Sequence, residues 1–491
     1  MTHIKPFSLY TVLLLTLCSG CAWAQSLVIQ HVTVIDATGR GPAPNMTVVV
    51  DGDRIVAVTP SKKKMRIPKD AAEVDGTGKF LIPGLWDMHV HGASDERAPW
   101  SHLLFLANGV VGVRDMSGPA DAHAWRATQL ANEDPSPAIY LGSPIVDGPN
   151  PVWPDSIVVA DEVQARDVVD QQQQRGADFI KVYSRLSREA YFAIADEAKK
   201  RGIAFEGHVP ESVTAAEASD AGQKSIEHLT RVAESCSREE ATIDAELSRQ
   251  EALFRAPDAT LSQKMESGKG IIGLDLRAIE TYDDATAQAL FVRFVKNGTW
   301  QCPTLTLLRA QIDDPLPADD PRLKYLSETV RAKWDGGYYK NLPPPARAAL
   351  VNLSKAQFGE SMKIVGVMHR AGVPILAGTD TMNPQCVPGF GLHDELALLV
   401  EAGLSPMAAL QAATRNAAQF MGQLDRRGTI EAGKIADLVL LDRDPLADIH
   451  NTRAIQAVVL NGKLFPHAAL DAMLAKAQKL ASRQENGAAG K

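Results

Sequence analysis

The chain has 491 residues, 45% of them hydrophobic, which is enough for more than one domain with a sizeable core. Its 51 basic and 59 acidic residues give a net charge of −8, which argues against a nucleic-acid partner because phosphate binding needs clustered Lys and Arg. The one basic run, residues 62–66, is typical of a solvated turn.

Residues 1–24 have the features of an export signal. A weakly positive start precedes the apolar run Leu9–Leu17, which is too short to span a bilayer because a spanning helix needs roughly 20 residues. Ala22-Trp23-Ala24 matches the small-x-small cleavage pattern, so we expect cleavage after Ala24 and an exported, periplasmic protein. Acylation of Cys21, as in a lipoprotein, is the less favoured alternative. No later segment has the length and apolarity of a transmembrane helix.

Three cysteines lie beyond this signal, at Cys236, Cys302 and Cys386. An odd number of thiols cannot all pair within one chain, so at most one disulfide is expected. None of them has the spacing of a zinc knuckle.

Short strand patterns lie at both ends of the chain and flank everything else. They occupy residues 27–35, 46–50 and 54–58 near the start, and 433–441 and 454–464 near the end. We predict one small β-sandwich built from residues 25–80 and 426–466, followed by a C-terminal helix and tail over 467–491.

Strand and helix patterns alternate between these two sets, which indicates parallel β/α units. The expected strands lie at about 82–90, 109–115, 138–146, 178–183, 203–208, 225–228, 299–306 and 373–379. Eight such strands predict an α/β fold with a closed (β/α)₈ TIM barrel over residues 81–425. An open doubly wound sheet is the alternative.

Two connections are longer than ordinary loops: residues 231–297, after the sixth strand, and residues 309–350, after the seventh. Both follow the carboxyl ends of strands, where the active sites of barrels lie. We expect these insertions to form walls or a lid over the site, and decoration or an oligomer contact is nearly as well supported.

Potential metal ligands stand at the ends of the predicted strands. His89 and His91 are two apart on one strand, so both imidazoles point to the same face. Four later strands end in further candidates, namely Lys181, His208, His228 and Asp380. Asp87 shares the face of His89 and is the weakest candidate. Imidazole and carboxylate ligands suit Zn²⁺ and similar divalent ions.

Each of these residues has an ordinary explanation when taken alone. A single His at a strand end is usually a hydrogen-bonded core or surface residue, and an Asp after Gly-Thr is usually a turn residue. Their shared place at successive strand ends favours a metal site instead. His393 follows the eighth strand and could face this pocket, but a role at a helix start is preferred.

Lys181 needs a chemical change to fit such a site, because an ammonium group repels a cation. Carboxylation by CO₂ would turn it into an anionic carbamate that can bridge two ions. Two ions about 3.5–4 Å apart can share a hydroxide and polarise a carbonyl group. The sequence therefore predicts two divalent ions, with Zn²⁺ as the leading choice and Mn²⁺, Co²⁺ and Fe²⁺ also compatible.

The chain resembles the amidohydrolase superfamily, in the branch of imidazolonepropionase-related and prolidase-like exported enzymes. The motifs that carry this resemblance are Asp51–Val56, Ile82–His91, Ile180–Tyr183, Gly207-His208, Ile226–His228, Ala377–Asp380 and Gly433–Leu438. The resemblance covers nearly all of the chain beyond the signal, and it implies the barrel with a β-sandwich.

The resemblance also implies a role for each ligand. His89, His91 and Asp380 would bind the more buried ion. His208 and His228 would bind the second, with carboxylated Lys181 as the bridge. Asp380 would also carry a proton from the attacking hydroxide to the leaving amine.

Tyr183 and Arg185 lie just past Lys181 and are expected to contact the substrate or to donate to the developing oxyanion. The chain departs from prolidase-like relatives at residues 148–154, which replace a Gly/His-rich loop, and at residues 184–187, which replace a Gly-rich segment. Both departures leave the ligand motifs intact but weaken a dipeptidase assignment.

We therefore expect an exported binuclear-metal hydrolase of C–N bonds, acting on an amide or peptide-like bond in a small molecule such as a dipeptide or N-acyl amino acid. One alternative is a cyclic amide or amidine hydrolase or deaminase of the imidazolonepropionase type. The other is a non-catalytic binding barrel in the cell envelope. A homo-oligomer is compatible with the sequence.

Overall fold

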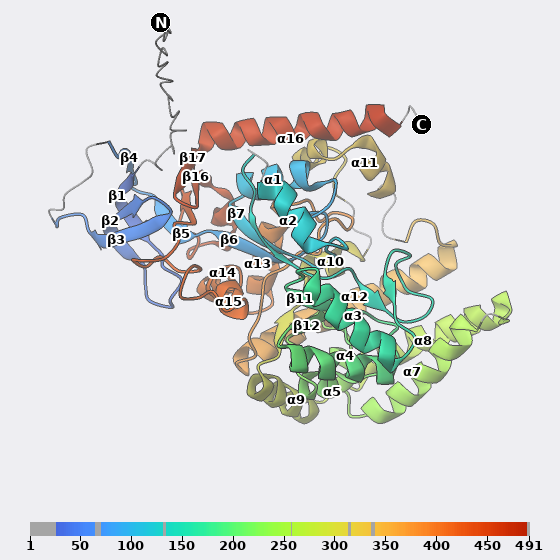
Figure 1. Ribbon diagram of the computed structural model, residues 1–491. Coiled ribbons are helices and arrows are strands. Elements are labelled where there is room, and N and C mark those ends of the chain that lie inside the picture. The colour runs from blue at the N-terminus through green and yellow to red at the C-terminus, as the bar shows by residue number, and fades with distance from the viewer. Residues whose placement is uncertain are drawn as a thin grey trace, which may run out of the picture.

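The computed structural model describes residues 26–63, 70–130, 134–256, 258–312, 316–334 and 339–488. The expected export signal, its cleavage after Ala24 and the alternative at Cys21 lie outside these residues. Figure 1 shows a sheet built from the two chain ends at one side and parallel strands with their helices at the other. Among the described helices, none is long and apolar enough to cross a membrane.

Strands from both chain ends form one sheet in the order β17-β16-β15-β5-β1-β2-β3, and β4 also pairs with β1. Their bounds are β1 (Leu27–Val34), β2 (Ala43–Asp51), β3 (Arg54–Pro60), β4 (Ala72–Asp75), β5 (Phe80–Pro83), β15 (Leu438–Leu441), β16 (Ile455–Leu460) and β17 (Lys463–Pro466). β5 joins the two ends, because it pairs with β15 on one side and β1 on the other. The predicted union of both ends is confirmed as one sheet, whereas the two-layered sandwich stays a prediction.

Two parallel sheets make up the middle of the chain, in the orders β6-β7-β8 and β10-β9-β11-β12-β13-β14. Their bounds are β6 (Leu85–Val90), β7 (Val110–Asp115), β8 (Ala138–Leu141), β9 (Val146–Asp147), β10 (Ile157–Val158), β11 (Phe179–Val182), β12 (Ala204–Gly207), β13 (Ser225–Glu227) and β14 (Trp300–Cys302). Every residue of β6, β7 and β11 is buried. Such strands read as continuous apolar runs because helices cover parallel sheets.

The helices begin and end where local chemistry requires it. α4 (Arg188–Arg201) is capped by the Ser187 hydroxyl, which accepts from the Ala190 N–H, and it ends at Gly202 with a φ of 66°. α14 (Pro406–Ala412) starts after the Ser405 cap with proline in its first turn. Both helix starts follow from local signals in the sequence. The remaining helices on the strand-to-strand connections are α1 (Ala98–Ala107), α2 (Ala122–Leu130), α3 (Glu162–Gln174), α5 (Ala215–Asp220), α13 (Phe390–Glu401) and α15 (Arg415–Phe420).

The expected eighth strand, 373–379, is not a regular strand. It makes only a parallel bridge from Ile375 to Gln301, with a second bridge just beyond it from Thr381 to Val90. Its backbone approaches β6 and β14 closely, since a Cβ on Gly378 would lie 2.5 Å from the Cys302 sulfur. This crowding, with the positive φ of Asp380 that follows, explains why the ladder is broken.

Hydrogen bonds still connect the two parallel sheets through their edges. On one side, the Ser143 N–H donates to the Phe179 carbonyl at 2.9 Å. On the other, segment 375–381 lies between β14 and β6, and the Leu376 N–H donates to the Gln301 carbonyl at 2.9 Å. The carboxyl ends of the parallel strands therefore face one shared region.

The two insertions are largely helical. Residues 231–297 hold α6 (Val232–Ser235), α7 (Glu240–Arg255), α8 (Leu261–Glu280) and α9 (Asp284–Asn297). The described parts of the second insertion and its borders hold α10 (Leu305–Ala310), the 3₁₀ helix η1 (Pro321–Tyr325), α11 (Glu328–Trp334) and the start of α12 (Pro344–Arg370). In Figure 1 the packed pair α7 and α8 projects from the body of the protein. The expected domain boundaries stay predictions.

The end of the chain forms α16 (His467–Ala488), after the 3₁₀ helix η2 (Ile449–Arg453) and β16–β17. α16 lies along one side of the molecule and contacts α1 and α11 (Figure 1).

Cys236, Cys302 and Cys386 are buried and free.

Candidate metal centre

Three of the predicted ligands, His89, His91 and His228, converge on Asp380 at the carboxyl end of the parallel strands. The carboxylate oxygens of Asp380 lie 3.3 Å from His89 Nε2, 3.0 Å from His91 Nε2 and 3.8 Å from His228 Nε2. His208 joins the group from β12, because the centroid of its ring lies 4.9 Å from that of His228. The His-x-His pair, two later strand ends and the segment after β14 thus meet as the sequence predicts.

Three of these imidazoles are held by a hydrogen bond at Nδ1. The partner of His89 is Glu227 at 2.7 Å, and the partner of His228 is the Thr304 hydroxyl at 2.6 Å. For His208 it is the Ser184 hydroxyl, at 2.9 Å. Metal-binding histidines are oriented in this way, with the outer nitrogen fixed and the other presented to the ion.

The atoms that face inward have no hydrogen-bond partner. His89 Nε2, His208 Nε2, Lys181 Nζ and Asp380 Oδ1 are all buried and unsatisfied. Leaving a polar atom buried without a partner costs about 1–3 kcal/mol, so a cluster of four needs an explanation. Nitrogen and carboxylate donors gathered in this way fit a divalent cation.

Burial sets the protonation states of the cluster. It lowers the pKa of His228 to about 4 and holds the pKa values of His89 and His208 well below the usual range. Burial also lowers the pKa of Lys181 to about 8. Neutral imidazole is the form that binds metals, so these three rings are suited to that role.

Asp380 stays ionised in this buried place. Burial works to raise the pKa of its carboxyl group, but the neighbouring imidazoles of His89, His228 and His91 outweigh it and lower the pKa overall. A permanent carboxylate can both bind a cation and accept a proton.

The backbone is strained where the ligands stand. His228, Thr304 and Asp380 have φ values of 57°, 46° and 56°, in the left-handed region that non-glycine residues rarely adopt. Such conformations cost of order 1–3 kcal/mol each and persist where the surrounding structure holds them, which is typical of functional sites.

The other expected site residues lie around this cluster. The Tyr183 ring stacks on His208 with its centroid 3.9 Å away, and its hydroxyl accepts from the Trp153 indole at 3.0 Å. Arg185 lines a neighbouring groove of about 250 Å³ beside α7, and its buried Nε has no hydrogen-bond partner. The structure thus places both expected residues near the candidate metal centre. The Tyr183 ring is in direct contact with His208, one of the predicted ligands.

Asp87 and His393 have structural roles instead. Asp87 accepts from the Thr379 N–H at 3.0 Å and from its hydroxyl at 2.7 Å, which fixes the segment leading to Asp380. Burial raises the pKa of Asp87 to about 7. His393 lies in the first turn of α13 and bonds to the Thr452 hydroxyl and the Asn108 carbonyl, consistent with the preferred helix-start role.

The structure also contains a layer of buried charged side chains beneath the ligands, which the sequence analysis did not identify. Arg114, Glu206 and Glu227 are each fully buried, on β7, β12 and β13. Arg114 donates to Glu206 at 2.7 Å and to both oxygens of Glu227 at 2.9 Å. A signal was present, because charged residues inside apolar strands are rare unless paired.

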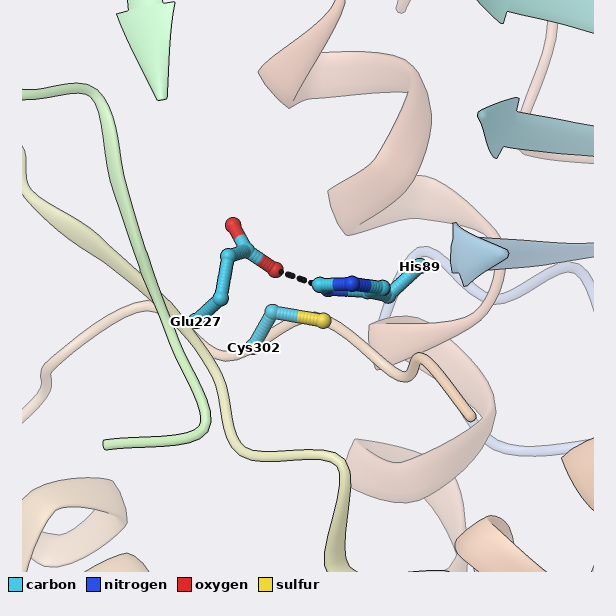
Figure 2. Close-up of side chains that lie close together, drawn as sticks. All are labelled: His89, Glu227 and Cys302. Atoms are coloured by element: carbon cyan, nitrogen blue, oxygen red, sulfur yellow. Dashed lines mark hydrogen bonds and ion pairs between the residues drawn. The ribbon is translucent and has the colours of Figure 1, made fainter. Parts of the chain in front are cut away.

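Among the residues that the structure describes, two groups of side chains have the geometry to hold an ion: His89, His228 and Asp380, and His89, Glu227 and Cys302. Figure 2 shows the second, in which Glu227 points at the edge of the His89 ring. Their 2.7 Å contact is a hydrogen bond and leaves no space for an ion between them. Burial also raises the pKa of the Cys302 thiol well above its usual value, so no thiolate is offered. The first group is therefore the better candidate for a metal centre.

Comparison with known proteins agrees with this arrangement. The sequence profile of the amidohydrolase family matches residues 356–465. An imidazolonepropionase from Aromatoleum aromaticum is 42% identical over 87 residues, which are 17% of this chain and 20% of that protein. The solved bottromycin amidohydrolase is 25% identical, with a TM-score of 0.70 over 93% of this chain and 90% of that one. A Xaa-Pro dipeptidase shares the fold, with 19% identity and a TM-score of 0.63 over 90% of this chain and all of that one.

The motifs, the site and these comparisons show that the chain is similar to members of the amidohydrolase superfamily. The match spans only about a fifth of the length of the imidazolonepropionase.

Proposed function

We propose that this protein is an exported, binuclear-metal-dependent hydrolase of C–N bonds, acting on amide or peptide-like bonds in a small molecule. The observation that carries the proposal is the cluster of inward-facing, unsatisfied donors, His89 Nε2, His208 Nε2 and Asp380 Oδ1, in one buried place. The amidohydrolase relatives support the same chemistry.

Divalent ions held here, with Zn²⁺ the leading choice, would polarise the scissile carbonyl and lower the pKa of a water. His89, His91 and Asp380 would hold one ion, and His208 and His228 the other. Asp380 accepts the proton of the attacking water and passes it to the leaving amine, since it is ionised and lies among the imidazoles.

Lys181 completes the site in this proposal as a carbamate formed with CO₂. The amine nitrogen adds to CO₂ and loses one proton, which leaves an anion with two oxygen donors. Two observations support this: Nζ is buried without a hydrogen-bond partner, and it lies 5.6 Å from the Tyr183 ring, which in turn stacks on His208.

The fold proposed around this site is a closed (β/α)₈ barrel with a β-sandwich from both chain ends. Two links between the parallel sheets support closure. The Ser143 N–H donates to the Phe179 carbonyl on β11, and segment 375–381 bonds to β14 through Leu376 and to β6 through Ala377, which accepts from Met88. In such a barrel the catalytic residues stand at the carboxyl ends of the strands.

The substrate class proposed first is a dipeptide or N-acyl amino acid. Arg185 supports it, because its guanidinium, which also donates to the Asn150 carbonyl, lies in a groove lined by Ser184, the partner of His208, and is suited to a carboxylate. Tyr183 would contact the substrate from its place on His208. A cyclic amide or amidine of the imidazolonepropionase type is the second candidate, favoured by the identity to that relative.

A screen of the purified protein tests the proposal. The panel contains dipeptides, N-acyl amino acids and cyclic amides, each with and without Zn²⁺ or Mn²⁺, and the Asp380→Asn variant serves as the control. We expect metal-dependent release of an amine from members of one group and none with the variant. A metal-replete protein that binds panel members but hydrolyses none would instead favour a binding barrel.

A further inference from the structure

We propose that Glu227 is a positioning residue, which keeps the proton of His89 on Nδ1 and so leaves Nε2 available for an ion. The inference rests on the metal centre of the proposed function, and it concerns a contact between two motifs, Ile226–His228 and Ile82–His91. Glu227 comes from β13 and His89 from β6, so the contact joins two strands that are far apart in the sequence.

The geometry of the pair determines the tautomer. Glu227 Oε2 lies 2.7 Å from His89 Nδ1, both side chains are fully buried, and Figure 2 shows the carboxylate directed at the ring. An ionised carboxylate only accepts hydrogen bonds. The contact at Nδ1 is a hydrogen bond, whereas Nε2 makes none, so the proton of a neutral imidazole is on Nδ1. Nε2 then carries the lone pair, and this is the atom that faces Asp380 at 3.3 Å.

Arg114 fixes the other side of Glu227. Its guanidinium donates to both carboxylate oxygens at 2.9 Å, and its Nε donates to the Met88 carbonyl at 2.5 Å, one residue before His89. The same side chain therefore holds the carboxylate and the backbone that carries the imidazole. Such support orients a metal ligand and raises its basicity.

A purely structural role is the competing explanation, because Glu227 also neutralises a buried arginine. Glu206 separates the two explanations. It accepts from the same Arg114 at 2.7 Å and is equally buried, but its described contacts are with Arg114 and Lys224 and not with His89. Glu206→Gln is therefore a matched control for Glu227→Gln.

The experiment measures Zn²⁺ affinity by competition with a chromophoric chelator in the wild-type protein and both variants. Circular dichroism and thermal melting check that each is folded. We expect Glu227→Gln to bind the tighter Zn²⁺ about 10–100-fold more weakly, in line with losses at other supporting partners of metal ligands, and Glu206→Gln to bind it as the wild type does. Wild-type affinity in Glu227→Gln, or equal losses in both variants, would overturn the positioning role.

A second measurement needs no variant of the buried layer. In the metal-free wild-type protein with ¹⁵N-labelled histidine, we expect the His89 ring to carry its proton on Nδ1, with the signal assigned by its loss in His89→Asn. A proton on Nε2 would contradict the proposal. Because this test uses neither metal nor substrate, it separates a failure of the positioning role from a failure of the proposed function.

Discussion

The sheet built from the chain ends and the carboxyl ends of the parallel strands are both deeply buried, but with opposite chemistry. The sheet packs apolar side chains such as Ile29, Val48 and Leu440 in one cluster. The strand ends instead bury Arg114, Glu227 and Lys181, together with the histidines. Apolar burial stabilises a fold by about 25 cal/mol per Å², whereas burying ions costs several kcal/mol each before pairing. Burial in the second region therefore lowers stability, a cost that the proposed metal site would explain.

The largest effect on turnover should come from Asp380→Asn at the strand ends. The change removes the proton acceptor but keeps an oxygen ligand, so we expect most of the metal to stay and kcat to fall about a thousandfold, within the usual range for lost acid–base catalysis. Elemental analysis and initial rates check the two halves of the prediction. Near-normal turnover would remove Asp380 from proton transfer.

Lys181→Ala should have the next largest effect. Without the bridging carbamate we expect the variant to hold one ion fewer per chain than the wild type and to turn over more slowly. Lys199→Ala is the control, since that lysine is exposed near the end of α4. Two ions per chain in Lys181→Ala would show that the carbamate bridge is wrong.

Arg185→Gln should act on substrate binding. Loss of a charged hydrogen bond is worth about 1.5–3 kcal/mol, so kcat/KM for a carboxylate-bearing substrate should fall at least about tenfold, mainly through KM. Arg188→Gln changes an arginine three residues on that pairs with Glu217 at the surface, and it should leave the kinetics unchanged. Equal kinetics for Arg185→Gln would exclude the carboxylate contact.

Leu440→Ala should have the smallest effect on turnover. It tests the sheet built from the chain ends, where we expect a change to affect stability and not catalysis. Leu440 is 2% exposed in the core of the sheet, so the cavity should lower the free energy of unfolding by about 2–5 kcal/mol. Val56→Ala, at a half-exposed position in β3, should cost about 0.5 kcal/mol or less. Denaturant unfolding measures both, and folded Leu440→Ala should keep wild-type kcat. A fall in kcat would mean that the two regions are coupled.

The same contrast explains how far the sequence could predict the structure. Strand periodicity and helix caps are local signals, so the sequence could predict the strands from both chain ends and the helix from Ser187 to Gly202. The positions of the ligands at strand ends likewise predicted that four of them meet, namely His89, His91, His228 and Asp380. The break in the last strand was not predictable, because it depends on how closely the backbone at Gly378 approaches Cys302 and His89, which are far away in the sequence. The hydrogen bonds of Arg114 could not be predicted either, because its partners lie on strands far away in the sequence.

Some expectations stay predictions for a different physical reason. A carbamate on Lys181, the identity of the ions and the processing after Ala24 are chemical events rather than consequences of chain folding. The choice of substrate depends on which molecule groove residues such as Arg185 bind, and this is a property of the complex rather than of the folded chain.

The number of divalent ions per chain tests the central claim most directly. Elemental analysis of the wild-type protein, purified in metal-replete buffer and freed of loosely bound ions, should give two per chain. A folded protein that retains none would contradict the metal centre on which the whole account depends.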